Sequence, residues 1–168
     1  MSTAGIMETP PYLTFKLEEE IFALDISKIR EVLDFTTVTK VPRTPEFMRG
    51  VINLRGSVVP VVDLRLKFGM TKTEQTVNTC IIITEVTVDN ETVILGALAD
   101  SVQEVMDLGP EHIEPAPKIG TRLNTAFIKG MGKRDNNFII ILDVDKVFSA
   151  DELVLVQAGQ AETPLQEA

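Results

Sequence analysis

The sequence is poor in the residue types on which most enzyme sites depend. Among its 168 residues it has one cysteine, one histidine and no tryptophan. Cys80 cannot close an intrachain disulfide, and His112 lies alone in a proline-rich segment, so neither residue indicates a paired nucleophile. No CxxC or HxxxH spacing offers a zinc site, and no glycine-rich loop of the nucleotide-binding type offers a phosphate cradle. The sequence therefore predicts no catalytic residue, no metal and no cofactor.

Basic charge and long apolar runs are also scarce. The formal net charge of −9 disfavours nucleic acid as a partner, because proteins that bind a phosphate backbone present a basic face. The N-terminus has no basic region followed by an apolar run, so no signal peptide is predicted, and no run is long enough to span a membrane. Ile81–Ile83 after Cys80 indicate a strand with a buried thiol, which fits a reducing cytoplasm. We expect a cytoplasmic protein without direct membrane insertion.

Short apolar and β-branched runs separated by turn residues are abundant. A chain of this length forms one domain, or two small halves that share a core. Many short strands with few helices indicate paired small β-barrels, a mostly β fold. The expected division is a flexible leader (1–11), a first barrel mainly in 12–70, a second barrel mainly in 79–142, a C-terminal helix at about 149–156 with capping-box residues Ser149 and Glu152, and a flexible acidic tail (157–168).

The segment Thr44–Gly69 organises this interpretation. It predicts a helical turn, a strand over Val51–Leu54, a tight turn at Arg55-Gly56, a second strand over Val58–Val62 and another helical turn. Glycine takes the positive φ that a tight hairpin turn needs. The segment is therefore a predicted β-hairpin flanked by helical turns.

This hairpin occurs a second time at a constant offset. The string FMRGVI, which starts at Phe47, becomes FIKGMG at Phe127, and VVDLRLKF, with Asp63, becomes ILDVDKVF, with Asp143. Upstream, IREVLD corresponds to VQEVMD, so that Glu31 matches Glu104. Because the matches keep their order, an internal duplication explains them better than chance. The second copy lacks an NLRG equivalent and reads GMGKRD there.

Alternating apolar and polar residues predict further strands outside this hairpin. They are Tyr12–Leu17 with Ile21–Ile26, Arg30–Phe35, Thr79–Thr87 with Glu91–Ala99, Gln103–Leu108, and Phe127–Met131 with Asn137–Leu142. Two segments are expected to lack regular structure, the polar connection Met70–Asn78 and the proline-rich loop Gly109–Gly120.

Two aspartates, Asp63 and Asp143, could be interpreted as paired catalytic carboxylates. Each follows an apolar strand and precedes a helical turn, which is where an aspartate caps a helix, so capping is the favoured interpretation. A carboxylate-dependent enzyme or a small-ligand barrel stays open as an alternative. Arg49, Arg55 and Glu31 have no role that the strand pattern requires. They fit either a surface salt bridge or the charged rim of an apolar groove at a protein interface.

The sequence GVINLRGSVVPVVDLRLKFG resembles the signature of the CheW family of bacterial chemotaxis coupling proteins. The EEEIFALDISKIREVL opening and the PAP loop extend the resemblance over residues 12–156. It implies two five-stranded barrels, similar to SH3 folds, around a shared apolar core. It also implies a non-catalytic adaptor that bridges the regulatory domain of the histidine kinase CheA and the cytoplasmic tips of chemoreceptors. A coupling domain from a kinase or a receiver fusion is a close alternative, although the short ends and the lack of a phosphoacceptor histidine favour a stand-alone adaptor.

By position, the resemblance also implies binding residues. The receptor-binding residues would be Ile29, Glu31, Arg49, Gly50 and Arg55, with an Arg55–Glu31 salt bridge shaping a groove at the barrel junction. The kinase-binding residues would be Glu114, Lys118 and Ile119, around the Pro115–Ile119 loop. The chain departs from the family twice, with Glu18-Glu19-Glu20 where many relatives have a glycine, and with loop-end charges at Glu114 and Lys118 that some relatives reverse.

Overall fold

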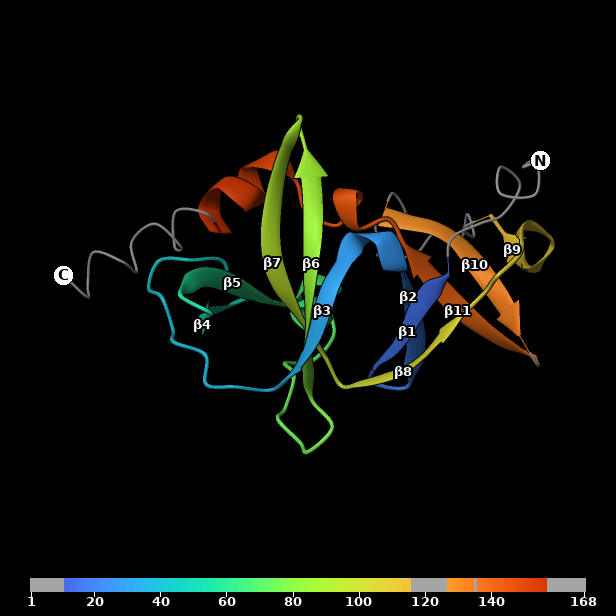
Figure 1. Ribbon diagram of the computed structural model, residues 1–168, viewed down its shortest axis with the longest axis horizontal. Coiled ribbons are helices and arrows are strands. Elements are labelled where there is room, and N and C mark those ends of the chain that lie inside the picture. The colour runs from blue at the N-terminus through green and yellow to red at the C-terminus, as the bar shows by residue number, and fades with distance from the viewer. Residues whose placement is uncertain (1–10, 116–126, 135, 157–168) are drawn as a thin grey trace.

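Two curled β-sheets form the protein in the computed structural model, which describes residues 11–115, 127–134 and 136–156 (Figure 1). The strands are β1 (Tyr12–Leu17), β2 (Glu20–Asp25), β3 (Ile29–Asp34), β4 (Met48–Leu54), β5 (Ser57–Asp63), β6 (Cys80–Val88), β7 (Glu91–Ala99), β8 (Ser101–Met106), β9 (Ile113–Glu114), β10 (Ile128–Arg134) and β11 (Asn137–Leu142). The short helices are η1 (Ile26–Lys28), α2 (Leu64–Lys67), η2 (Pro110–His112), η4 (Val144–Lys146) and a C-terminal helix over residues 150–156.

The strand order defines two barrels. Sheet A has the order β8-β1-β2-β11-β10-β9, and sheet B has the order β3-β6-β7-β5-β4. Both sheets curl strongly, and in Figure 1 sheet B lies to the left of sheet A. The mostly β fold with two SH3-like barrels is confirmed, and the two-residue β9 adds a short sixth strand to sheet A.

A shared apolar core joins the two sheets. Four phenylalanine rings run through it, with centroids 6.0 Å apart for Phe15–Phe22, 5.7 Å for Phe22–Phe68 and 4.7 Å for Phe68–Phe127. Each sheet also has a smaller cluster of its own, around Ile81 in sheet B and around Ile141 in sheet A. Because stacked aromatic pairs add to the burial energy, this row of rings stabilises the junction as well as each barrel.

The predicted division of the barrels by halves of the chain is wrong for two hairpins. The β1–β2 hairpin lies in sheet A beside β8 and β11, and the β6–β7 hairpin lies in sheet B beside β3 and β5. Parallel pairing makes these connections, β2 with β11 and β5 with β7. Each barrel therefore takes strands from both 12–70 and 79–142. An alternating pattern predicts that a strand exists and which face is apolar, but it does not select the partner strand.

The internal duplication is confirmed in three dimensions. A bulge falls between Met48 and Gly50 in the β4–β5 pair, and the same bulge falls between Ile128 and Gly130 in the β10–β11 pair. The N–H of Asp63 donates to the carbonyl of Phe47 at 2.6 Å, and that of Asp143 donates to the carbonyl of Phe127 at 2.8 Å. The equivalent strands β3 and β8 both lie at the outside of a hairpin, so the two sheets are built alike.

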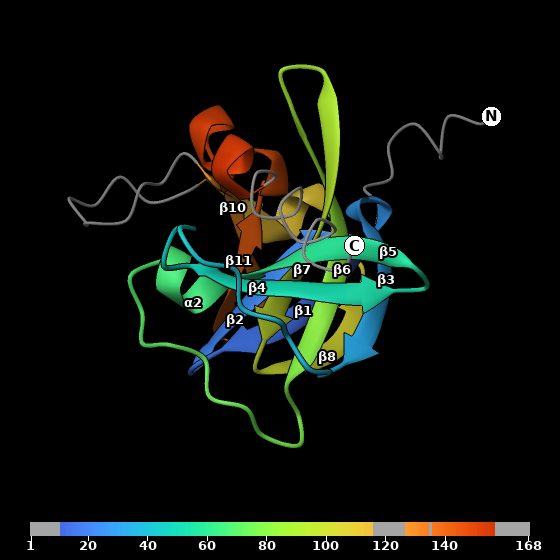
Figure 2. The same cartoon turned by 90° about the vertical axis from the view of Figure 1, so that its left-hand side faces the viewer.

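The predicted C-terminal helix is confirmed together with its cap. Ser149 N–H donates to the Glu152 carboxylate at 2.8 Å, and the Glu152 N–H donates to Ser149 Oγ at 3.1 Å. This reciprocal pair is a capping box. Glu152 also pairs with Lys67 at 3.2 Å, which ties the helix to α2. Figure 2 shows the C-terminal helix, in red, above α2, in green.

Several local predictions need correction. Gly109–Gly120 contains η2 and β9 within its described part, so it is more ordered than its prolines indicate. The helical turn predicted before β4 is only a hydrogen-bonded turn at residues 46–47, closed by a 2.9 Å bond from Met48 N–H to the Pro45 carbonyl. Cys80 is half-buried rather than buried, and desolvation raises the pKa of its thiol.

The predicted leader up to residue 10 and the tail 157–168 lie outside the described residues. No described helix is long and apolar enough to cross a bilayer.

Candidate partner-binding site

The β4–β5 turn and the edge strand β3 bring Arg55 and Glu31 together. Arg55 and Gly56 both have positive φ, 50° and 89°, as a two-residue hairpin turn of type I′ requires. Asn53 supports the turn, because its side-chain oxygen accepts from the Gly56 N–H at 2.8 Å. Held in this way, the Arg55 guanidinium forms an ion pair with the Glu31 carboxylate. The salt bridge implied by the resemblance is therefore present.

A groove of about 540 Å³ lies beside this ion pair in sheet B. Its rim carries Arg30, Glu31 and Arg55, and Arg30 pairs across β3 and β6 with Glu85 at 2.7 Å. Its apolar lining consists of Leu54, Val58, Val59, Ile83, Val93 and Ile94. The Arg55 side chain is 69% exposed, so its charge stays accessible to a partner. A charged rim over an apolar floor is the arrangement expected of a protein interface.

Arg49 and Gly50 do not line this groove. Arg49 extends to Asp63 at 3.0 Å and to the Thr73 carbonyl at 3.2 Å, and only 23% of its side chain is exposed. Gly50 is buried with φ of 144°, and a Cβ there would clash with the carbonyl oxygen of Thr39. Ile29 is half-buried against the shared core. Of the five predicted receptor residues, the structure brings only Glu31 and Arg55 together.

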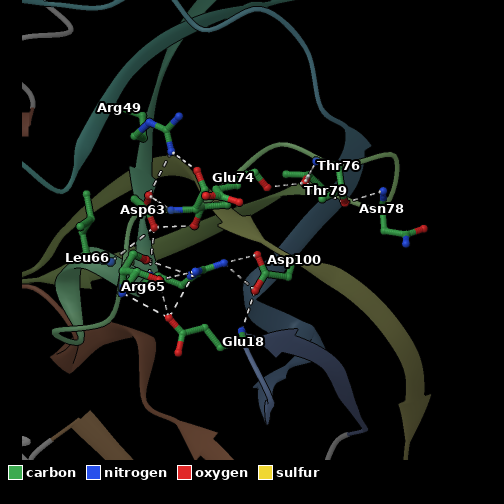
Figure 3. Close-up of polar contacts among 12 residues, drawn as sticks. Glu18, Arg49, Asp63, Arg65, Leu66, Glu74, Thr76, Asn78, Thr79 and Asp100 are labelled. Atoms are coloured by element: carbon green, nitrogen blue, oxygen red, sulfur yellow. Dashed lines mark hydrogen bonds and ion pairs between the residues drawn. The ribbon is translucent and has the colours of Figure 1, made fainter.

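Asp63 is a structural residue at the end of β5, as Figure 3 shows. Its carboxylate is 0% exposed and accepts from the N–H groups of Arg65 and Leu66, which caps α2. It also accepts from Thr73 N–H at 3.0 Å and from Thr73 Oγ1 at 2.7 Å. Asp143 caps η4 in the same way through Asp145 N–H. The capping interpretation is confirmed for both aspartates, and neither oxygen of Asp63 is left for chemistry.

Arg65, which the sequence did not single out, connects three elements at the junction of the sheets (Figure 3). It donates to Asp100 at 3.0 and 3.1 Å, to Glu18 at 3.2 Å and to Thr71 Oγ1 at 2.6 Å. Its side chain is only 13% exposed, so these are sheltered charge-assisted bonds. Arg65 thus links the β1–β2 turn of sheet A to the β7–β8 corner and to the segment after α2.

Glu18 belongs to this network, at a position where the family resemblance implies a glycine. It has positive φ of 57°, and its N–H donates to Asp100 at 2.6 Å. Hydrogen bonds from the side chain and backbone of Thr71, followed by the charge of Arg65, lower the pKa of the Glu18 carboxyl. Glu18 is therefore a member of the junction network and not only a turn residue. Its presence where the family resemblance implies a glycine was the one available signal of this role.

The predicted kinase-contact residues are described only in part. Glu114 lies exposed on β9 and pairs with Lys133 of β10 at 2.9 Å, whereas Lys118 and Ile119 lie outside the described residues. Glu114 borders a groove of about 990 Å³ in sheet A, which also exposes Val105 and Phe138.

By the duplication, the sheet A groove is the counterpart of the groove beside Glu31, since β8 replaces β3 and the β10–β11 turn replaces the β4–β5 turn. Glu104 occupies the place of Glu31, and Asn136 occupies the place of Gly56. The NLRG sequence of the β4–β5 turn has no counterpart in the β10–β11 turn. Across the described ranges, no cluster of three or more histidine, cysteine or acidic residues could hold a metal ion.

Comparison with known proteins gives consistent matches. The CheW-like domain family matches residues 11–152. The chain is 34% identical to the chemotaxis protein CheW of Klebsiella aerogenes over 153 residues, which cover 91% of this chain and 90% of that protein. It is 32% identical to the chemotaxis protein CheW of Thermotoga maritima over 150 residues, 88% of this chain and 91% of that protein. The crystal structure of the scaffolding protein TtCheW from Thermoanaerobacter tengcongensis superposes with a TM-score of 0.75 at 37% identity, covering 86% of this chain and 95% of that one.

Proposed function

Because this chain belongs to the CheW family and acts as a chemotaxis adaptor, we propose that it couples the cytoplasmic tips of chemoreceptors to the histidine kinase CheA. The adaptor binds both partners at once and holds the kinase within reach of the receptor signal. It works through protein contacts alone, without catalysis, and joins membrane-bound receptor arrays through those contacts.

The observation that carries the receptor contact is the Arg55–Glu31 ion pair above the sheet B groove. An amphipathic receptor helix places its apolar face on the partly exposed Leu54, Val58 and Ile94, while Arg55 pairs with a receptor carboxylate. The planar guanidinium suits this task, since it binds a carboxylate and packs on apolar atoms. Glu31 orients Arg55 before the partner arrives, which lowers the entropy lost on binding.

The roles of Arg49, Gly50 and Ile29 at this contact are indirect. Gly50 and Arg49 hold β4 against Thr39 and Asp63, so they position the β4–β5 hairpin that carries Arg55. Ile29 anchors the start of β3, the strand that carries Glu31.

The kinase contact is proposed at Glu114, Lys118 and Ile119. Support comes from the position of Glu114, which is exposed on a two-residue edge strand and close to the apolar Phe138 of the same sheet. A regulatory domain of similar fold can meet such an edge. Two small contacts to two partners give each binary complex modest affinity, and the assembled complex is tighter because the contacts act together.

Co-purification tests this proposal. The untagged full-length chain is captured by an immobilised CheA regulatory domain and then by a receptor-tip fragment. Arg55→Ala and Glu31→Ala are expected to weaken receptor capture at least about fivefold while kinase capture is unchanged, as for loss of one charged interface contact. Lys146→Ala is the matched control, because Lys146 is exposed and lies outside both grooves. Full receptor capture by both groove variants would refute the groove assignment.

A further inference from the structure

A cationic pocket of about 450 Å³ lies between the β3–β4 loop and α2. Lys40 and Arg43 reach it from the loop, and Lys72 reaches it from the segment after α2. All three are exposed, and Glu46 is the single carboxylate among the lining residues. In a chain of net charge −9, such a concentration of positive charge stands out from its surroundings.

The three cations of this pocket are also unpaired. Within the described residues, none of Lys40, Arg43 and Lys72 forms an ion pair or a side-chain hydrogen bond. Most described arginines and lysines elsewhere do pair, for example Arg30 with Glu85 and Lys28 with Asp145. The fold therefore pairs most of its other described cations and leaves these three available.

The floor of the pocket is apolar and fixed. Val41 and Met48 are buried in the shared core, and Leu66 of α2 lies beside them. The loop above this floor is closed by two 2.9 Å bonds, from Thr44 Oγ1 to the Val41 carbonyl and from Met48 N–H to the Pro45 carbonyl. Prolines at 42 and 45 restrict φ on both sides of Arg43.

Lys72 is held in place by its neighbours on both sides. Thr71 donates its N–H and its hydroxyl to Glu18, at 3.2 and 2.8 Å. Thr73 is buried and donates both groups to Asp63. The backbone of Lys72 is thus fixed between two anchored residues. A preformed site loses less conformational entropy on binding than a mobile loop does.

We propose that the cationic pocket is a docking site for an acidic segment of a partner protein, a short stretch with carboxylates on both sides of one apolar residue. The carboxylates pair with Lys40, Arg43 and Lys72, and the apolar side chain packs on Val41, Met48 and Leu66. The apolar floor favours a peptide over a small inorganic anion, which would leave it uncovered. The pocket shares no lining residue with the groove beside Glu31, so this contact adds to the proposed receptor contact and is separable from it.

Titration of the full-length, ¹⁵N-labelled chain with the acidic peptide DELED tests the proposal. We expect amide shifts concentrated at Lys40–Glu46, Leu66 and Lys72, and no shifts at Arg30 or Arg55.

Fluorescence anisotropy with the labelled peptide measures the affinity of variants. Lys40→Glu/Lys72→Glu is expected to weaken binding about tenfold or more. Two exposed charge pairs are lost, and the new glutamates repel the carboxylates of the peptide. Lys133→Glu/Lys146→Glu makes the same change of charge at two exposed lysines outside the pocket and is expected to retain most of the affinity.

Three results would overturn the proposal. The first is equal loss of binding in the two double variants, which would indicate only a long-range effect of net charge. The second is displacement of the peptide by inorganic phosphate at equal concentration, which would indicate a small-anion site. The third is unchanged binding when the central leucine of the peptide is replaced by glycine, which would remove the role of the apolar floor. None of these results bears on receptor capture, which tests the other groove.

Discussion

Thr73 donates both its backbone N–H and its hydroxyl to the carboxylate of Asp63, at 3.0 and 2.7 Å. The segment after α2 is polar and has no regular structure, yet this pair fastens it to the end of β5. Arg49 completes the arrangement from β4. One buried carboxylate therefore joins the β4–β5 strand pair, the cap of α2 and the segment that leads from α2 to β6 within sheet B.

Asp63→Ala is expected to destabilise the fold by about 3–5 kcal/mol, because it leaves the partly buried Arg49 and the buried Thr73 groups without their acceptor. Urea unfolding followed by far-UV circular dichroism measures the free energy. Asp143→Ala is the control, since this carboxylate is half-exposed and caps only η4, and a loss of about 1 kcal/mol is expected. Equal losses in the two variants would contradict the special position of Asp63.

Gly50→Ala is expected to cost more than about 2 kcal/mol, because an added Cβ meets the Thr39 carbonyl and the backbone has φ of 144°. Gly69→Ala separates these two causes. Gly69 also has positive φ, 81°, but open space surrounds its Cβ position, so only a backbone strain of about 1 kcal/mol is expected. Thermal unfolding of both variants at the same protein concentration measures which substitution lowers the melting temperature more. A larger loss for Gly69→Ala than for Gly50→Ala would contradict the role of the close contact with Thr39.

The Glu18 network predicts a loss of stability in acid. The folded-state pKa of Glu18 lies below its ordinary value of about 4.5, so the unfolded chain takes up its proton first. The contribution is therefore complete above pH 4.5 and is lost as the pH falls through the folded-state pKa. Glu18→Gln removes this titration. The stability difference between wild type and Glu18→Gln is expected to be constant from pH 7 to about 5.5 and to shrink below 4.5. A difference independent of pH down to 3 would show that the Glu18 charge has no part in the network.

The Glu31–Arg55 pair is expected to matter for binding and not for folding. Arg55 is largely exposed, and exposed ion pairs contribute at most about 1 kcal/mol. Arg55→Ala and Glu31→Ala should therefore shift the urea midpoint only slightly and keep the β-type circular dichroism spectrum. A large loss of stability in either variant would contradict this expectation, because weaker receptor capture would then report unfolding. The charge-swapped variant Glu31→Arg/Arg55→Glu, which keeps an ion pair at this place, would then separate loss of the fold from loss of the contact.

Much of the local structure could be predicted from short-range patterns. The β6–β7 hairpin was expected from the alternation of Thr79–Thr87 and Glu91–Ala99, and Asp89 and Asn90 between them take the positive φ of a tight turn. The capping box at Ser149 and the caps at Asp63 and Asp143 were read from spacing alone. Such features depend on residues within a few positions of one another, and those separations are fixed by the chain itself.

The candidate site was predictable only through its motif. Glu31 and Arg55 were identified from a resemblance, and the structure brings them together across β3 and the β4–β5 turn. Arg49 was identified from the same resemblance, but its side chain extends to Asp63 and does not line the groove. No sequence motif marks Lys40, Arg43 or Lys72. The cationic pocket is assembled from two segments that are distant in the sequence, so its residues have no fixed spacing that could identify it.

The sequence by itself determined the β-rich class, the duplicated hairpin, its turns and its caps, because periodicity and turn chemistry are local properties. Only the tertiary structure decided that the β1–β2 and β6–β7 hairpins exchange places between the barrels. That choice depends on parallel pairing of β2 with β11 and of β5 with β7, and on the burial of a phenylalanine row shared by both halves. It also decided that Arg65, Asp100 and Glu18 meet at the junction, since they come from three separate elements.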